Sequence, residues 1–183
     1  MPPSKTMSAI SQSFLTAKDD GTVPQKLKES LARLFGSIPP VTFGSSIMDK
    51  TLTTEMYLNK REEEPQKWEC KTVSETTVTP DMTNLWGTMH GGCTSFLIDN
   101  CTSLTLSLLA AHLGKSPMIV SQSLNIMFHA PAPTGVKLKI ISYSIASGSR
   151  ITSARCEIYD VTNARLIASG VHAKMEANQP SSL

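Results

Sequence analysis

The sequence predicts an α+β protein in which one long helix lies on one face of an antiparallel β-sheet. First, the 183 residues are of single-domain size and can form one sizeable core. Second, a single long helical segment is expected at residues 92–113. Third, strand-like segments surround it, punctuated by turn residues: 48–59 and 68–78 before the helix, and 118–128, 136–145, 151–161 and 165–175 after it.

The N-terminal region is expected to lie outside this helix and sheet. Residues 1–21 are polar and end in the turn-like sequence Asp-Asp-Gly, which indicates a mobile tail. A short amphipathic helix is expected at residues 24–35, with three leucines on one stripe and a proline in its first turn. The expected organisation is a tail and short helix at residues 1–45, a domain at residues 46–177 and a flexible tail at residues 178–183.

The segment after the long helix shows the clearest strand pattern. Val136, Leu138 and Ile140 alternate with two lysines, as expected for a strand with one buried face. The alternation loses its phase at Ile141, where we expect a β-bulge.

Composition excludes several classes of function. A net charge of +2 is too small to predict a nucleic-acid or membrane-surface partner, and no uninterrupted apolar run reaches the roughly 18 residues that span a bilayer. The first 20 residues lack the apolar centre of a secretory signal and make a poor transit peptide. The four cysteines form no C-x-x-C pair and have no histidine at metal-ligand spacing, so we expect buried reduced thiols and no metal. An intracellular protein, cytoplasmic or mitochondrial, is predicted.

The long helix contains the feature that points to chemistry. Apolar residues surround most of its circumference, which is typical of a buried helix, yet Asp99 and Asn100 lie in its middle. A buried carboxylate is normally paired, and no Lys or Arg lies three or four residues from Asp99. Periodicity alone leaves two interpretations open: a functional carboxylate, or one that faces solvent on a narrow polar strip.

The start of this helix favours the functional interpretation. The sequence Gly-Thr-Met-His-Gly-Gly at residues 87–92 lets backbone approach a ligand closely. The first amides of a helix are unpaired and can hold a developing oxyanion. Gly92 and Asp99 are seven residues apart and lie on similar faces of the helix. A carboxylate behind a glycine-rich helix start suits acyl transfer to water.

The motif at residues 84–92, N-L-W-G-T-M-H-G-G, followed by F-L-I-D-N at residues 96–100, resembles the hotdog-fold acyl-CoA thioesterases. The resemblance is to the phenylacetate-pathway type and to the eukaryotic thioesterase superfamily members of the acyl-CoA thioesterase 13 group. It covers roughly residues 80–176 and leaves the first 45 residues outside. One departure is Ser123, where close relatives often carry an acidic residue.

The resemblance implies a hotdog fold, with a long central helix wrapped by a curved antiparallel sheet. It implies a hydrolase of lipid metabolism that converts acyl-CoA to free acid and CoA, with no cofactor besides the CoA of the substrate. It also implies homodimers whose sheets join edge to edge, often paired into homotetramers, with active sites between subunits.

The resemblance also implies roles for five residues of a catalytic site. Asp99 would be the general base or nucleophile, and the Gly91 amide would polarise the thioester carbonyl. Asn84 would position the water or the carbonyl, Ser121 would support the water, and His90 would orient the loop. From the residues alone, Asn84 could be a turn residue and His90 a packed histidine. Ser121 is expected on the strand face of Ser123, Asn125 and His129, opposite Leu124 and Ile126.

For the CoA moiety, the resemblance implies two segments. The first contains His129, Ala130 and Pro131, and the second is the turn with Gly148, Ser149 and Arg150. Arg150 and Lys174 are candidates for the phosphates, although a residue of either kind is more often just a solvated charge.

Two competing functions stay open. A hotdog enoyl-CoA hydratase or dehydratase needs an Asp/His pair in a different motif, which the sequence lacks. A non-catalytic acyl-CoA-binding protein would share the fold, because fold does not guarantee chemistry.

Overall fold

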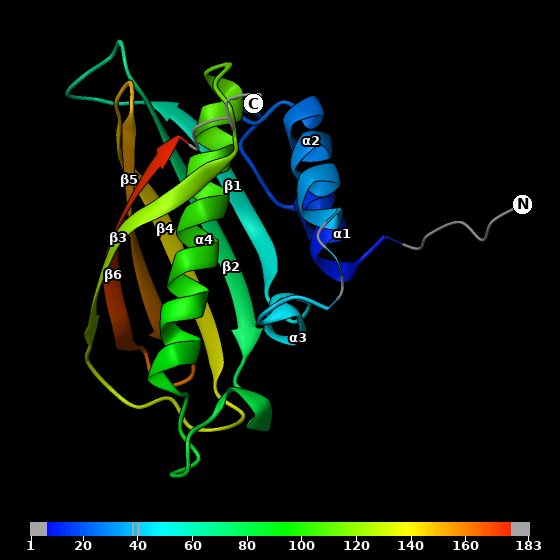
Figure 1. Ribbon diagram of the computed structural model, residues 1–183, viewed down its shortest axis with the longest axis vertical. Coiled ribbons are helices and arrows are strands. Elements are labelled where there is room, and N and C mark those ends of the chain that lie inside the picture. The colour runs from blue at the N-terminus through cyan, green and yellow to red at the C-terminus, as the bar shows by residue number, and fades with distance from the viewer. Residues whose placement is uncertain (1–6, 38, 40, 177–183) are drawn as a thin grey trace, which may run out of the picture.

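Six strands form one antiparallel sheet in the order β1-β2-β4-β5-β6-β3, curved around a single long helix (Figure 1). The computed structural model describes residues 7–37, 39 and 41–176. The strands are β1 Leu52–Lys60, β2 Trp68–Thr77, β3 Ile119–Phe128, β4 Lys137–Ser147, β5 Ile151–Asp160 and β6 Arg165–Glu176. The helices are α1 Ala9–Thr16, α2 Gln25–Gly36, α3 Ser45–Met48 and α4 Gly91–His112, with a 3₁₀ turn at Pro80–Met82. The α+β architecture and the long helix are therefore confirmed.

Helix α4 forms the centre of the core. Its first half places Leu97 and Ile98, both fully buried, against the inner residues of β4 and β5. Its second half packs Leu104 and Leu108 against β1 and the N-terminal helices. The helix has the length and apolar composition of a membrane span, but its apolar window is 67% buried by the rest of the chain. It is thus the core helix of this domain.

The N-terminal residues from Ala9 onward are part of this core, which corrects the expectation of a mobile tail; residues 1–6 lie outside the described residues. Residues 9–16 form α1, whose Phe14 is fully buried and meets Phe35 of α2 edge to face, with ring centroids 5.3 Å apart. The backbone of Lys18 pairs with β1: its amide donates to the Thr54 carbonyl (2.8 Å) and its carbonyl accepts from the Met56 amide (2.9 Å). This segment covers the edge strand β1, where backbone groups would otherwise be unpaired.

An ion pair between a buried lysine and a partly buried aspartate fixes α2 to the segment after α1. The Lys28 ammonium contacts the Asp19 carboxylate and donates to the Ala17 carbonyl (2.7 Å). The hydrogen bond from Lys28 holds the pKa of Asp19 below its ordinary value. The helix expected at residues 24–35 is confirmed as α2.

Three further expectations are resolved by the structure. Residues 45–48 form α3, so the first strand begins at Leu52 rather than at residue 48. The bulge in β4 lies between Ser144 and Ala146, not at Ile141, because inward-facing Ser142 and Ser144 continue the alternation with small polar side chains. The expected C-terminal tail lies outside the described residues. All four cysteines are free and buried, and burial raises the pKa of Cys93 to about 11.

Candidate active site

Asp99 lies where the middle of α4 passes β3 and β6. Its Oδ1 accepts a hydrogen bond from Ser121 Oγ (3.1 Å) on β3 and lies 3.6 Å from the Nζ of Lys174 on β6. The Nε2 of His172, also on β6, is 3.4 Å from the same oxygen. The Asp99 side chain is 39% exposed, whereas Lys174 and His172 are buried. Asp99 is therefore held on its inner side and open to a ligand on its outer side.

Ser121 reaches Asp99 because β3 contains a bulge. The register with β6 shifts between Ser121 and Ser123, so Gln122 has no partner. Ser121 then pairs with Lys174 and Leu124 with His172, two residues whose side chains face α4. This corrects the expected strand faces: Ser121 shares the inner face with Leu124 rather than the face of Ser123.

Lys174 occupies a different place from the one expected. Its side chain is only 6% exposed, and its Nζ donates to Ser103 Oγ (2.6 Å) and Ser121 Oγ (3.2 Å) beside Asp99. Burial lowers the pKa of Lys174, and the Asp99 carboxylate opposes that shift. A side chain enclosed in this way cannot also reach CoA phosphates, so the structure places Lys174 with the candidate catalytic residues.

His172 is the residue that sequence analysis did not single out. Its Nδ1 lies 2.7 Å from Thr102 Oγ1, and that hydroxyl donates to the Ile98 carbonyl (2.7 Å). The contact with Thr102 fixes the imidazole ring so that Nε2 faces Asp99. Within the part of the chain that the structure describes, Nε2 is buried with no hydrogen-bond partner. The sequence feature that could have identified His172 is its spacing from Lys174, because residues two apart lie on the same face of a strand.

The buried His172 predicts a pH dependence of stability. Burial, with a smaller contribution from Lys174, lowers the pKa of His172 below 6.5, while Asp99 acts in the opposite direction. Below about pH 6.5 the unfolded chain therefore binds more protons at this histidine than the folded chain. The contribution of His172 to the free energy of unfolding is therefore fully present above this pH and is lost as the pH falls. Urea unfolding between about pH 5 and pH 8 should show a weaker pH dependence for His172→Gln than for wild type. If the free energy of unfolding changed equally with pH in the variant and in wild type, this prediction would be wrong.

The start of α4 is organised by His90. Its Nδ1 accepts from the Gly92 amide (2.9 Å), so His90 is the N-cap of the helix. Among the described residues, the Gly91 amide donates to no partner and stays available to an incoming ligand. His90 is itself exposed, so it acts as a cap rather than as a packed core histidine.

Asn84 shapes the loop that leads into this helix. Its Oδ1 accepts from the amides of Trp86 (2.9 Å) and Thr88 (3.3 Å), and its Nδ2 donates to Thr88 Oγ1 (3.1 Å). Within one chain Asn84 therefore behaves as a turn residue. The tip of the loop is open, with Leu85 99% exposed.

One chain does not bring its helix start and its carboxylate together. Gly91 and Asp99 are eight residues apart on α4, which separates them by about 12 Å along the axis. A single thioester carbonyl cannot contact both groups at hydrogen-bond distance. The sequence-based idea that they form one site is thus compatible with this geometry only if they come from two copies of the chain.

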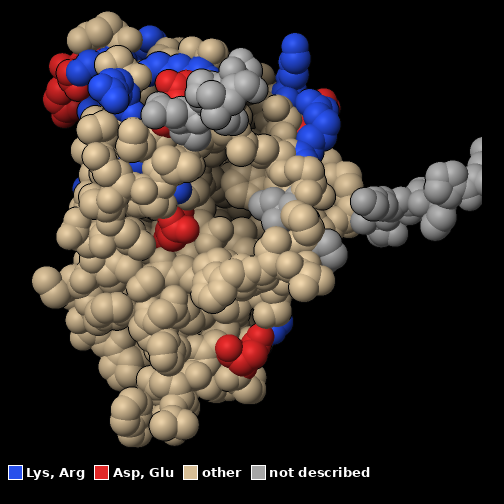
Figure 2. Space-filling model, viewed as in Figure 1, with Lys and Arg blue, Asp and Glu red and all other residues tan. Residues whose placement is uncertain are grey.

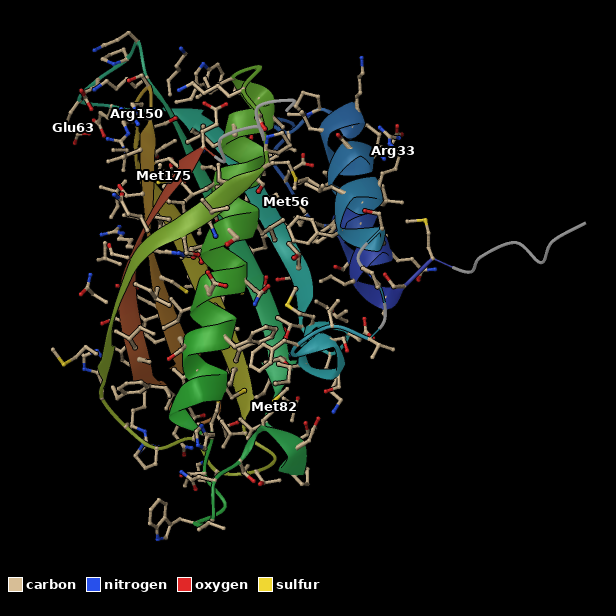
Figure 3. The ribbon with its side chains drawn as sticks, viewed as in Figure 1. Arg33, Met56, Glu63, Met82, Arg150 and Met175 are labelled. Carbon is tan, nitrogen blue, oxygen red and sulfur yellow. The ribbon has the colours of Figure 1, made fainter. Side chains whose placement is uncertain are left out.

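The two segments expected to hold CoA lie at opposite ends of the sheet. The loop with His129, Ala130 and Pro131 adjoins the helix start, where the Met89 amide donates to the Ala132 carbonyl (2.8 Å). His129 Nε2 contacts Ser169 Oγ at 2.9 Å. Figure 3 shows Arg150 at the end far from Met82, whose carbonyl accepts from the His90 amide. In that turn with Gly148 and Ser149, the Gly148 carbonyl accepts from Lys115 Nζ (2.8 Å).

A central helix wrapped by a single antiparallel sheet, with a carboxylate at mid-helix, defines a hotdog-fold protein. The structure superimposes on zebrafish thioesterase superfamily member 2 with a TM-score of 0.65 and 24% identity, covering 82% of this chain and 98% of that one. The mouse member 2 gives a TM-score of 0.59 and 25% identity over 84% and 96% of the two chains.

Sequence similarity then identifies the family. Residues 87–167 match the thioesterase superfamily. The mouse and human proteins named acyl-coenzyme A thioesterase 13 are each 32% identical to this chain over 108 residues, which is 59% of this chain and 74% of theirs. The chain therefore belongs to the thioesterase superfamily.

Proposed function

We propose that this protein hydrolyses acyl-CoA thioesters to a free acid and CoA, with Asp99 as general base or nucleophile. The observation that carries the proposal is the setting of Asp99, whose Oδ1 contacts Ser121 and Lys174 while its outer side stays open. A carboxylate fixed in this way can act on a water or on a bound thioester. The relatives named acyl-coenzyme A thioesterase 13 support CoA thioesters as the substrate class.

In the general-base form of the reaction, Asp99 removes a proton from water as the oxygen attacks the thioester carbon. The carbonyl oxygen becomes an oxyanion, which the Gly91 amide at a helix start stabilises. The carbon–sulfur bond then breaks, and the CoA thiolate takes up the proton held by Asp99. Ser121 and Lys174 keep the carboxylate oriented during both steps, because Ser121 donates to Asp99 and the Lys174 ammonium pairs with Asp99 while it donates to Ser121.

Because Gly91 and Asp99 of one chain are too far apart, we assign the oxyanion site and the carboxylate to two copies. Strand β3 is the edge of the sheet opposite the covered strand β1, and its side chains Val120, Met127 and Phe128 are 47–63% exposed. Pairing of β3 with its own copy would join two sheets and bring the start of one α4 toward the Asp99 of the other. The CoA loop at residues 129–133 and the turn at residues 147–150 would then also come from different copies, in a homodimer or a homotetramer.

A charge on the β3 edge should dissociate this assembly. Two-fold pairing places the strand against itself, so lysines introduced at Val120 and Met127 appear on both copies and repel. Sedimentation velocity should show a wild-type oligomer and a monomeric Val120→Lys/Met127→Lys variant without thioesterase activity. Val41→Lys, a control at a 93% exposed position, should leave assembly and activity unchanged. An active monomeric variant would contradict a site shared between copies.

The function itself is tested by thiol release from a panel of short, medium, long and aryl acyl-CoAs. Turnover of at least one member, lost in Asp99→Asn, is the expected result. A folded, oligomeric wild type that binds acyl-CoA but releases no thiol from any of them would favour a binding protein instead.

A further inference from the structure

A buried ammonium group lies behind the candidate catalytic carboxylate. The Lys174 Nζ donates to Ser103 Oγ at 2.6 Å and to Ser121 Oγ at 3.2 Å. Its distance to Asp99 Oδ1 is 3.6 Å, which is close enough for an ion pair but too long for a hydrogen bond. Lys174 is therefore held beside the carboxylate by two hydroxyl groups and not by a hydrogen bond to the carboxylate itself.

Ser103 connects this ammonium to the helix that carries Asp99. It lies four residues after Asp99, which is about one turn further along α4. Its hydroxyl donates its single hydrogen to the Asp99 backbone carbonyl at 2.6 Å, so its oxygen is left to accept from Lys174. The backbone of α4 therefore fixes the hydroxyl, and the hydroxyl in turn fixes the ammonium.

The ammonium determines the direction of the Ser121 hydrogen bond. An ammonium can only donate and a hydroxyl has one hydrogen, so Ser121 accepts from Lys174 and gives its hydrogen to Asp99 Oδ1, 3.1 Å away. All the hydrogen bonds and ion pairs that the described residues form with the Asp99 carboxylate are to Oδ1. Oδ2 is therefore the oxygen left for water or for the thioester.

Stability alone does not explain a lysine at this position. The side chain is only 6% exposed, and replacing a buried ion pair by apolar residues is often neutral or stabilising. Figure 2 shows that charged side chains on this face gather mainly toward the end of α4, while the surface around the middle of the helix is mostly uncharged. Among the described residues, Asp99 is the only carboxylate that pairs with Lys174. The arrangement therefore points to the chemistry of Asp99.

We propose that Ser103 and Lys174 are positioning residues for the reaction at Asp99. Ser103 holds the ammonium close enough to turn the Ser121 hydrogen toward Oδ1, but too far away to donate to the carboxylate directly. If Ser103 were absent, the freed N–H of Lys174 would turn to the nearest remaining acceptor, which is the Asp99 carboxylate. The ammonium would then occupy the group that has to take up a proton or attack the thioester. This inference rests on the proposed function, because it concerns a reaction that uses Asp99.

A matched set of variants on α4 tests the role of Ser103. Ser103→Ala should lower kcat by about tenfold with KM unchanged, which corresponds to the loss of one hydrogen bond to a charged group. Ser103→Thr keeps a hydroxyl that can bond the same carbonyl and should retain the wild-type kcat. The control is Ser107→Ala, one turn further along the helix. It removes a hydroxyl that donates to the Pro117 carbonyl (3.1 Å) and should leave both constants unchanged.

A double variant tests whether Ser103 acts through Lys174. Lys174→Met should lower kcat by about tenfold or more, again with KM unchanged. Adding Ser103→Ala to this variant should cause no further loss, because the ammonium that Ser103 positions is already gone. Urea unfolding of the same proteins should show that each is folded under the assay conditions. Losses that simply multiply in the double variant would show that the two residues act independently and would overturn the proposal.

The remaining outcomes separate this inference from the proposed function. If wild type releases thiol and Ser103→Ala or Lys174→Met keeps the wild-type kcat, the positioning role is wrong and the thioesterase proposal stands. The same conclusion follows if Ser103→Thr does not restore kcat, or if the two variants lower only stability. If wild type releases no thiol from any acyl-CoA, the proposed function fails and this inference fails with it.

Discussion

Replacing Asp99 by Asn is expected to lower kcat for acyl-CoA hydrolysis by about two to four orders of magnitude, the contribution typical of a positioned base or of the loss of a nucleophile. The amide is close in size and still accepts from Ser121, whose Oγ lies 3.1 Å from Oδ1. It cannot, however, take a proton from water or form an anhydride with the acyl group. The variant should therefore retain its fold and its substrate affinity. Thiol release under saturating acyl-CoA measures the loss.

The control for this experiment is a second carboxylate of the same chain. Asp81 is exposed on the 3₁₀ turn at Pro80–Met82 and pairs with Lys50 at 3.0 Å. Asp81→Asn should keep wild-type turnover, and Asp99→Asn should bind a non-hydrolysable thioether analogue with wild-type affinity. If Asp99→Asn kept more than about a tenth of wild-type kcat, the assigned role of Asp99 would be wrong.

The sequence predicted the sheet and the central helix because their patterns are local. The helix at residues 92–113 and the four strands after it are long segments with clear punctuation, and the structure has them within a few residues. Helix α1 has only eight residues, and three of them are serines or threonines, so it resembles a polar tail. Ser13 is buried because its hydroxyl accepts from the Thr53 amide (3.1 Å), a contact formed only after α1 packs on β1.

The candidate site was predicted less completely, because it depends on register. Asp99 stood out in the sequence as a carboxylate in an apolar helix. Its partners come from β3 and β6, more than 20 residues away, and no helical spacing identifies them. Ser121 was placed on the wrong face because one unpaired residue, Gln122, shifts the alternation of β3. Lys174 was expected at the surface because a lysine on a terminal strand usually is.

Replacing Phe14 by Ala is expected to destabilise the whole domain by about 3–5 kcal/mol, the usual cost of deleting a fully buried aromatic ring. Phe14 is 0% exposed and packs in the cluster that contains Leu31 of α2, Met56 of β1 and Leu108 of α4. This cluster extends from the N-terminal helices to the central helix, so the cavity left by the ring weakens all of these contacts. Urea unfolding should show one transition at a lower midpoint.

The same measurement decides whether α1 and α2 belong to the cooperative unit of the domain. Leu85→Ala, at a position 99% exposed, should change stability by less than about 0.5 kcal/mol. If Phe14→Ala changed the stability as little as Leu85→Ala, α1 would unfold separately from the sheet, and the edge of β1 would be covered only part of the time. The backbone bonds of Lys18 to Thr54 and Met56, and the ion pair of Lys28 with Asp19, argue against separate unfolding. These contacts connect the segment after α1 to both β1 and α2. Loss of the Phe14 ring should therefore weaken packing as far as Leu108, on the helix that carries Asp99.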